Sequence, residues 1–395
     1  MRIVRVANFV MPRSGGLRTA LRHLGAGYRA AGHDPVLIIP GPSFSDEDTD
    51  QGRVITLPGP LVPRMGGYRL LLDRARLSTT LKALRPDRLE VSDRTTLRWL
   101  GRWAKRQDVP SMMVSHESLA GLLRLFGPAP ARRVGDMLNT RSAADHDQIV
   151  CTTAWAAAEF ERLGTANLTQ VPLGVDLERF TPANHNPELR SRWSAKDDVL
   201  LLHCGRLSPE KKPRRSLEAL HHLRRAGVPA VLLVAGTGPL RAALQSEAAD
   251  RGLPVRFLGH IANQQELAAL LATVDAAIAP GPIETFGLAA LETLSSGTPV
   301  VVSSESALPE VIGPAGPAGL AAPGEGPAYA EALRQLLAIP EATRRAAART
   351  RAEHFPWQAS VAGFLQAHNA SVTPTATAAG PSGEGRHPFA VDHRS

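Results

Sequence analysis

Short apolar runs alternate with longer amphipathic segments along most of the chain. The apolar runs are typical of buried strands and occupy residues 2–9, 36–39, 111–115, 148–152, 199–203, 230–235, 255–258, 276–279 and 300–303, with a weaker run at 320–321. Helical periodicity follows several of them, over residues 17–31, 331–354 and 357–368. Because strands that alternate with helices form parallel sheets, the pattern predicts an α/β protein.

The alternating pattern falls into two units, separated by a turn-rich connector at residues 171–182 and a linker at 184–198. With 395 residues, the chain is long enough for two domains with a core each. We predict two Rossmann-like domains, over residues 1–180 and 181–370, whose doubly wound sheets face a cleft. The helix at residues 357–368 is expected to cross back onto the first domain.

Composition narrows the class of protein. Hydrophobic residues make up 43% and charged residues 21%, which is usual for a soluble globular protein. The amino-terminal segment lacks the apolar core and cleavage site of a signal peptide, so we expect a cytoplasmic protein. Cys151 and Cys204 have no metal-site spacing and are expected to be buried and unreactive. The tail at residues 371–395 is rich in small residues and proline, which predicts disorder.

Positive charge is concentrated in the first half of the chain. Residues 1–150 carry 23 Lys and Arg against 14 Asp and Glu, a net charge of +9. The net charge of the whole chain is +8, so the remaining residues contribute −1. Such asymmetry favours an anionic partner surface. Since no nucleic-acid-binding motif is visible, we expect no nucleic acid and favour an anionic membrane, contacted by the basic first domain.

A candidate membrane segment follows an apolar loop at residues 58–72. A helix is predicted over residues 68–84, with basic residues nearby and with one face shared by Leu70, Leu77, Leu81 and Leu84. This combination fits an interfacial anchor. It equally fits an ordinary amphipathic helix packed on its own sheet, and the pattern leaves both interpretations open.

Two glutamates lie eight positions apart around a Phe-Gly corner. Glu284 is expected in the loop after a strand, and Glu292 inside the helix that this loop opens. The free amides of that helix, near Phe286, Gly287 and Leu288, suit a diphosphate. Eight residues span roughly 12 Å, so one carboxylate can hold sugar hydroxyls and the other ribose hydroxyls. Two surface glutamates of an ordinary domain would give the same spacing.

Glycines and cations mark two further strand ends. Gly15 and Gly16 follow the first strand and allow close approach of a phosphate, although a plain flexible turn has the same composition. Their spacing is not the Gly-x-Gly-x-x-Gly of dinucleotide enzymes, which disfavours a dehydrogenase. Arg206 and Lys211 flank a turn after the first strand of the second unit and can converge on one anion. A surface charge run is the alternative.

Two histidines and one turn complete the candidate set. His116 stands at a strand end, where it can donate to a sugar hydroxyl or a leaving oxygen, or serve only the fold. His203 lies inside an apolar strand and is interpreted as a core histidine. Ile261 lies at a strand end that can offer backbone groups to a nucleotide base.

These motifs together resemble the retaining glycosyltransferases of family 4, which have the GT-B fold. The resemblance covers residues 1–370 and includes the connector at 171–180 and the glycine turn at 235–239. Residues 6–18 and 89–97 are further similar to bacterial GDP-mannose-dependent mannosyltransferases that add an α-1,6 mannose to phosphatidylinositol dimannoside. A related type acts on glucuronosyl diacylglycerol.

The resemblance implies a retaining hexosyltransferase at the inner face of the plasma membrane, with GDP-mannose as donor, a phosphatidylinositol mannoside as acceptor, and no metal or other cofactor. It implies roles in catalysis or donor binding for His116, Gly15, Gly16, Arg206, Lys211, Ile261, Glu284, Phe286, Gly287, Leu288 and Glu292. The cations would bind the diphosphate, Glu292 the ribose, Glu284 the donor sugar, and His116 the transferred sugar.

Other functions stay open on the residues alone. Spacing does not separate GDP-mannose from UDP-linked sugars, and the acceptor can be another glycolipid or a small soluble molecule. A non-catalytic nucleotide-sugar-binding protein is disfavoured because the cations and both glutamates are retained. No carboxylate nucleophile of the glycosidase type is evident.

Overall fold

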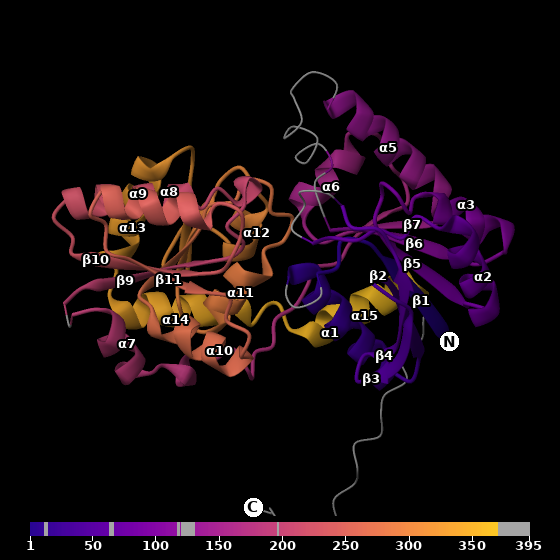
Figure 1. Cartoon of the computed structure of the whole chain (residues 1–395), viewed down its shortest axis with the longest axis horizontal. Helices are drawn as coiled ribbons and strands as arrows, with labels where there is room; N and C mark the ends of the chain where they lie inside the picture. The colour runs from indigo at the N-terminus through magenta and orange to yellow at the C-terminus, as the bar shows by residue number, and fades with distance from the viewer. Residues whose placement is uncertain (12–14, 63–66, 117–118, 120–130, 196, 370–395) are drawn as a thin grey trace, which may run out of the picture.

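The computed structural model describes residues 1–11, 15–62, 67–116, 119, 131–195 and 197–369. The chain forms two α/β lobes, each built on a largely parallel sheet, as Figure 1 shows. The α/β class predicted from the apolar pattern is confirmed. The tail at residues 371–395, for which disorder is predicted, lies outside the described residues, as do residues 12–14 and 63–66 of two candidate loops.

The first lobe contains, in the described part of the chain, an eight-stranded sheet of order β3-β4-β2-β1-β5-β6-β7-β8. Its strands are β1 (Arg2–Ala7), β2 (Asp34–Gly41), β3 (Ser45–Thr49), β4 (Gly52–Pro58), β5 (Arg88–Ser92), β6 (Ser111–Ser115), β7 (Gln148–Cys151) and β8 (Leu168–Gln170). Only the edge strand β3 runs antiparallel to its neighbour. The strand order changes direction between β1 and β5, so their following loops diverge to opposite sides.

The second lobe contains a parallel sheet of order β11-β10-β9-β12-β13-β14. Its strands are β9 (Val199–Cys204), β10 (Ala230–Ala235), β11 (Val255–Gly259), β12 (Ala276–Ala279), β13 (Val300–Ser303) and β14 (Gly319–Ala322). Strand order changes direction between β9 and β12. Each strand matches a predicted apolar run closely. Inner strands such as β10 and β13 are buried along their whole length, as expected for strands covered on both faces, whereas the edge strand β11 exposes Arg256.

Helices cover both faces of each sheet. They are α1 (Gly16–Ala30), α2 (Arg74–Leu84), α3 (Trp99–Arg106), α5 (Ala131–Asp145), α6 (Ala154–Glu161), α7 (Pro187–Trp193), α8 (Arg214–Arg225), α9 (Arg241–Asp250), α10 (Gln264–Thr273), α11 (Leu288–Ser295), α12 (Leu308–Ile312), α13 (Gly326–Leu337), α14 (Glu341–Ala352) and α15 (Trp357–Ala367), with short 3-10 turns at Pro182–Asn184 and Pro209–Lys211. In the first lobe, α1 and α15 pack on one face of the sheet, and α2 and α3 on the other.

Three predicted segments differ from the structure. The single helix predicted over residues 331–354 is two helices, because Pro340 cannot donate a helical hydrogen bond and separates α13 from α14. The helix predicted from residue 68 begins only at Arg74, where the Asp73 carboxylate accepts the amide hydrogen of Arg76 at 2.9 Å. The linker predicted at residues 184–198 contains the helix α7.

The shortened helix α2 changes the interpretation of its apolar face. Leu70 precedes the helix and does not share this face. Leu77, Leu81 and Leu84 are almost fully buried and belong to the core between α2, α3 and the first sheet. The helix therefore packs on its own sheet through these leucines, and they are not available as a membrane anchor.

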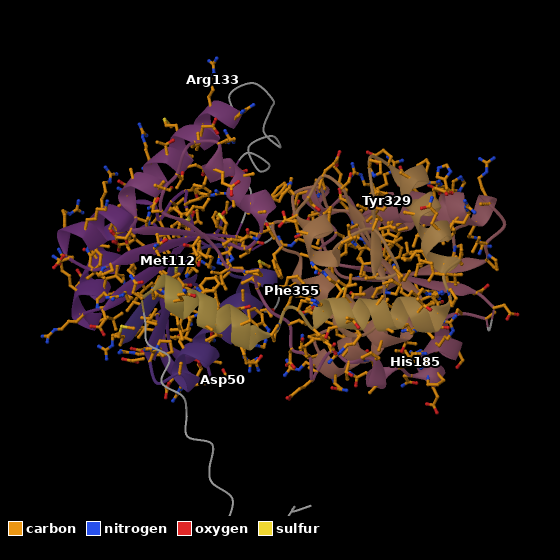
Figure 2. All side chains as sticks on the ribbon, turned by 180° about the vertical axis from the view of Figure 1, so that it is seen from behind. Asp50, Met112, Arg133, His185, Tyr329 and Phe355 are labelled. Atoms are coloured by element: carbon orange, nitrogen blue, oxygen red, sulfur yellow. The ribbon has the colours of Figure 1, made fainter. Side chains whose placement is uncertain are left out.

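The C-terminal helix α15 crosses back to the first lobe, as predicted. The chain returns beside the connector, where the Val175 amide donates to the Phe355 carbonyl at 2.9 Å. Figure 2 shows Phe355 between the two lobes. The ring of His23 on α1 stacks on the ring of Trp357 on α15, with their centroids 4.5 Å apart. Two distant parts of the chain thus build the first lobe.

Candidate functional site

Most sequence-predicted site residues lie in loops at the carboxyl ends of central strands. Gly15 and Gly16 follow β1, His116 follows β6, Arg206 and Lys211 follow β9, and Glu284 to Leu288 follow β12. The strands β1, β9 and β12 border the two points where strand order changes direction. Ligands of open α/β sheets bind at such points, because adjacent loops there move apart.

Direct contacts across the lobes bring these loops together. A Cβ atom on Gly16 would lie 3.6 Å from Cδ1 of Leu288, so the first turn of α1 faces the first turn of α11. The Thr285 hydroxyl donates to the His116 carbonyl at 2.6 Å. Two surface cavities, of about 410 and 660 Å³, are lined by other residues, on the β3–β4 side and beside α8 and α9. The loop contacts, rather than cavity size, locate the candidate site.

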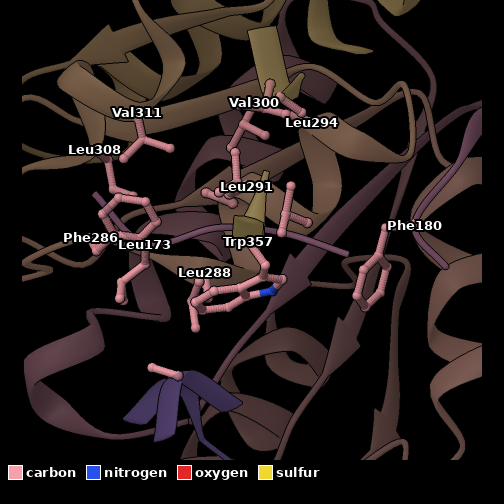
Figure 3. Close-up of a cluster of buried hydrophobic side chains, with 14 of the residues drawn as sticks. Leu173, Phe180, Phe286, Leu288, Leu291, Leu294, Val300, Leu308, Val311 and Trp357 are labelled. Atoms are coloured by element: carbon pink, nitrogen blue, oxygen red, sulfur yellow. The ribbon is translucent and has the colours of Figure 1, made fainter. Parts of the chain in front are cut away.

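The N-terminus of α11 is fixed by buried neighbours. Gly287 has a φ of +84°, and a Cβ there would lie 2.1 Å from Cδ2 of Leu308, so only glycine fits. Phe286 and Leu288 are buried in the apolar cluster of Figure 3. The first hydrogen bond of this turn runs from the Ala290 amide to the Gly287 carbonyl. The backbone amides before it, rather than the Phe286 ring, are therefore the groups suited to an anion.

The two predicted cations contact different partners in the structure. Nη2 of Arg206 donates to the Tyr68 hydroxyl of the first lobe at 2.7 Å, and its guanidinium lies 4.9 Å from the Tyr68 ring centroid. Nζ of Lys211 forms an ion pair with Oε1 of Glu284. The Lys211 pair joins a predicted phosphate ligand to a predicted sugar ligand. Lys211 thus lies beside the loop that carries Glu284, and Arg206 contacts the first lobe.

His116 is a neutral histidine at the end of β6. Burial lowers its pKa to about 4, and the nearby carboxylate of Glu90 only partly opposes this shift. Its Nε2 lies 3.3 Å from Oγ of Ser92, which ends the neighbouring strand β5. A neutral imidazole has one N–H donor and one acceptor nitrogen, so His116 can share hydrogen bonds with both Ser92 and a ligand hydroxyl.

Glu292 and Ile261 both belong to the second lobe. Glu292 is on the second turn of α11, where burial raises its pKa to about 8 against the opposing charge of Arg179. Ile261 follows β11, the edge strand of the second sheet, and packs against the core. His203 is buried and hydrogen-bonded to Ser216 Oγ at 2.9 Å, in agreement with a core role.

Sequence reasoning missed several residues at this boundary. The sequence pattern places Tyr68 in a helix, whereas in the structure it precedes α2 and contacts Arg206. Ser92 and Thr285, which contact His116, are not among the predicted site residues. The Glu310 carboxylate of the second lobe accepts the amides of Ala154 and Trp155 in the first turn of α6. Thr285 is the one missed residue that the sequence marks, because it lies between the predicted site residues Glu284 and Phe286. The partners in the contacts Arg206–Tyr68 and Glu310–Ala154 are more than a hundred positions apart, so no local pattern connects them. Ser92 and His116 are 24 positions apart.

The described residues contain neither a metal-binding cluster nor a membrane-spanning helix. Among them, no group of three or more His, Cys, Asp or Glu side chains is placed to hold a metal ion. No helix in this part of the chain is long and apolar enough to cross a bilayer. Burial raises the pKa of Cys151 and of Cys204 to about 12, so both are thiols rather than reactive thiolates at neutral pH.

Two family descriptions and several curated proteins match the chain. Residues 15–174 match the glycosyl transferase 4-like domain, and residues 186–353 match the glycosyl transferases of group 1. A GDP-mannose-dependent alpha-(1-6)-phosphatidylinositol dimannoside mannosyltransferase of Mycobacterium tuberculosis is 49% identical over 369 residues, covering 92% of this chain and 95% of that protein. A D-inositol 3-phosphate glycosyltransferase of Geodermatophilus obscurus is 33% identical over 298 residues, 71% of this chain and 65% of that protein.

Solved structures share the two-lobed arrangement at low sequence identity. A sucrose-phosphate synthase from Thermosynechococcus elongatus superposes with a TM-score of 0.74 and 21% identity, covering 93% of this chain and 98% of that one. Anabaena HepE in complex with UDP and glucose gives 0.74 and 17%, covering 94% and 100%. At this coverage the likeness extends over both lobes.

Proposed function

The chain belongs to the glycosyl transferases of group 1 and has the GT-B fold, and from this premise we propose that it transfers mannose from GDP-mannose to a phosphatidylinositol mannoside. The observation that carries this proposal is the 49% identity with the Mycobacterium tuberculosis dimannoside mannosyltransferase over nearly the full length of both chains. The proposal includes an α-1,6 linkage, retention of configuration at the sugar and action at the inner face of the plasma membrane.

The donor would bind along the boundary between the lobes. Arg206 and Lys211 would neutralise the diphosphate, together with the first amides of α11 and the backbone of Gly16. Glu284 already bonds Lys211 and would accept hydrogen bonds from sugar hydroxyls, while Glu292 would hold the ribose. His116, which is bonded to the Glu284 loop through Thr285, would contact the transferred mannose from the other side.

The reaction would need no protein nucleophile. The bond between the mannose C1 and the phosphate oxygen breaks, and the acceptor hydroxyl oxygen bonds to C1 on the same face. The hydroxyl proton passes to the departing diphosphate, which leaves as GDP. The two cations stabilise the charge that develops on this leaving group, and the lobes hold donor and acceptor in register. The proposed reaction uses no metal ion.

A panel of donors and acceptors tests the proposed function. With a phosphatidylinositol dimannoside acceptor, we expect GDP-mannose to give a kcat/KM at least about tenfold above those of GDP-glucose, UDP-glucose and UDP-N-acetylglucosamine. Nucleotide release with and without acceptor measures turnover, and NMR of the product determines linkage and anomeric configuration. Preference for UDP-N-acetylglucosamine would overturn the named donor, and loss of turnover in EDTA would overturn metal independence.

The surface around the start of α2 supports a membrane-bound acceptor. Phe44, Leu61 and Leu72 are each more than half exposed, which is unusual for large apolar side chains. The Arg76 guanidinium lies 5.8 Å from the Phe44 ring centroid, and Arg74 beside it is also exposed. Apolar side chains next to arginines suit the interface of an anionic bilayer. This patch, rather than the buried leucine face of α2, is the proposed membrane contact.

Binding to lipid vesicles tests this contact. We expect stronger binding to vesicles with anionic lipid than to neutral ones, and weaker binding as salt increases, because screening reduces the attraction of the arginines. Changing Phe44 and Leu72 to Ser should weaken binding by about tenfold or more through loss of buried apolar area. Met137→Ser, which changes an exposed apolar residue on α5, is the matched control. Equal binding to neutral and anionic vesicles at low salt would contradict the proposal.

A further inference from the structure

Thr285 is bonded to the first lobe through its hydroxyl and through its carbonyl. Its hydroxyl donates to the His116 carbonyl at 2.6 Å. Its own carbonyl accepts the hydroxyl of Thr153 at 2.9 Å and that of Thr152 at 3.3 Å. The residue is only 8% exposed, so water competes little for these bonds. A single residue of the loop after β12 is therefore held on two sides by the opposite lobe.

The groups that hold Thr285 are themselves fixed. The Thr153 hydroxyl caps α6, because it accepts the amide hydrogen of Ala156 at 3.2 Å while donating to Thr285. The two amides before it, of Ala154 and Trp155, donate to the carboxylate of Glu310 on α12. The residue before α12, Ala307, donates its amide hydrogen to the Glu284 carbonyl at 2.9 Å. The loop is thus connected to α6 directly and also through α12.

We propose that Thr285 is a positioning residue for the transfer reaction, which fixes His116 relative to the loop that carries Glu284. This inference rests on the proposed function, since it takes His116 and the Glu284 loop to face the same sugar. The Thr285 hydroxyl bonds the His116 backbone and leaves the imidazole free for Ser92 and a substrate hydroxyl. It therefore acts on the reaction through the placement of His116 rather than by contact with the reacting atoms.

Removal of the Thr285 hydroxyl has different consequences for a structural contact and for a positioning contact. A contact that only stabilises the fold would lower the melting temperature and leave the kinetics of the folded enzyme unchanged. A positioning contact would lower kcat, because small displacements of groups around a reacting centre have large effects on rate. Donor affinity should change little, since Arg206, Lys211 and the α11 amides all belong to the second lobe.

The test compares Thr285→Val, Thr285→Ser and Thr298→Val. Valine has nearly the shape of threonine but no hydroxyl, and serine restores the donor. Thr298 is a matched control, since its buried hydroxyl donates to the Leu271 carbonyl at 2.6 Å within the second lobe. We measure kcat, donor KM, the Kd for GDP by calorimetry and the melting temperature.

We expect Thr285→Val to lower kcat by about tenfold to a hundredfold, while donor KM and the GDP Kd change less than about threefold. Thr285→Ser should recover most of kcat, and Thr298→Val should lower the melting temperature without lowering kcat. A kcat of Thr285→Val within twofold of wild type would overturn the proposal. So would an equal loss in Thr298→Val, no recovery in Thr285→Ser, or a parallel loss of GDP affinity.

Failure of the proposed function gives a different result. If the wild type transfers another sugar, the donor panel identifies it and overturns the assignment of GDP-mannose. The three variants are then compared with that nucleotide sugar and the corresponding nucleotide. The ratio of kcat between Thr285→Ser and Thr285→Val still decides whether the hydroxyl positions His116.

Discussion

Arg206→Ala should weaken the binding of GDP-mannose by about 100-fold, because a charged hydrogen bond to a phosphate contributes about 1.5–3 kcal/mol and a guanidinium can form two. The residue follows β9 at the point where strand order changes direction, and its guanidinium is held by the ring and hydroxyl of Tyr68. Calorimetry with GDP and with GDP-mannose measures the loss. Arg206→Lys should recover only part of it, since lysine has no planar fork.

The control for Arg206 is another arginine of the same lobe. Arg225 is exposed in the last turn of α8, and Arg225→Ala should leave donor affinity at the wild-type value. Donor affinity unchanged in Arg206→Ala would refute its assignment to the diphosphate. A loss of melting temperature without loss of affinity would show that the contact with Tyr68 serves only to join the lobes.

His116→Ala should lower kcat by about 100-fold through the loss of a preorganised hydrogen bond to the transferred sugar. The substitution leaves the backbone carbonyl that Thr285 binds, so the contact between the lobes is kept. Burial lowers the pKa of His116 to about 4, so its imidazole stays neutral as pH falls from 8 to 6. The pH profile of wild-type kcat should therefore show no inflection from this residue near 6.5, and its protonation begins only as pH approaches 4.

His146, a buried histidine, provides the comparison. His146 is 1% exposed and bonds the Ser142 carbonyl at the end of α5, away from the candidate loops. His146→Ala should lower stability but preserve kcat at a temperature where the variant is folded. An inflection near pH 6.5 that His116→Ala abolishes would contradict a neutral His116. Equal kcat losses in both variants would assign the effect to folding.

The apolar pattern predicted every strand of the second sheet but missed β3, β4, β5 and β8 of the first. Strands such as Ala230–Ala235 are covered on both faces and are continuous apolar runs. The edge strand β3 has the sequence Ser-Asp-Glu-Asp-Thr and is held by ion pairs, including that between Arg53 and Asp46. No periodicity marks such a strand, since neither tertiary ion pairs nor edge pairing leaves an apolar pattern. The start of α2 was misplaced because the Asp73 cap, rather than periodicity, determines it.

The sequence predicted which loops form the candidate site, but not which residues of those loops contact one another. Glycines, cations and glutamates at strand ends indicated which loops to examine, and the structure places those loops against one another. The contact of Arg206 with Tyr68 spans 138 residues, and that of Thr285 with His116 spans 169. Such pairs depend on how two separately folded sheets are oriented, which a local pattern does not record. The ion pair of Lys211 with Glu284 lies within the second lobe, between the loops after the neighbouring strands β9 and β12, and its partners are 73 residues apart, which a local pattern also does not record.

Because α15 returns to the first lobe, that lobe completes its folding only after the second lobe has been synthesised. As the polypeptide leaves the ribosome, the first sheet is complete once β8 has emerged, but α1 still lacks its partner. Trp357 and Phe364, which cover that face, are translated only after the entire second sheet. The lobe made first is therefore finished last, and its exposed apolar surface during synthesis is a natural binding site for chaperones. A nascent chain halted before residue 357 would keep that surface open.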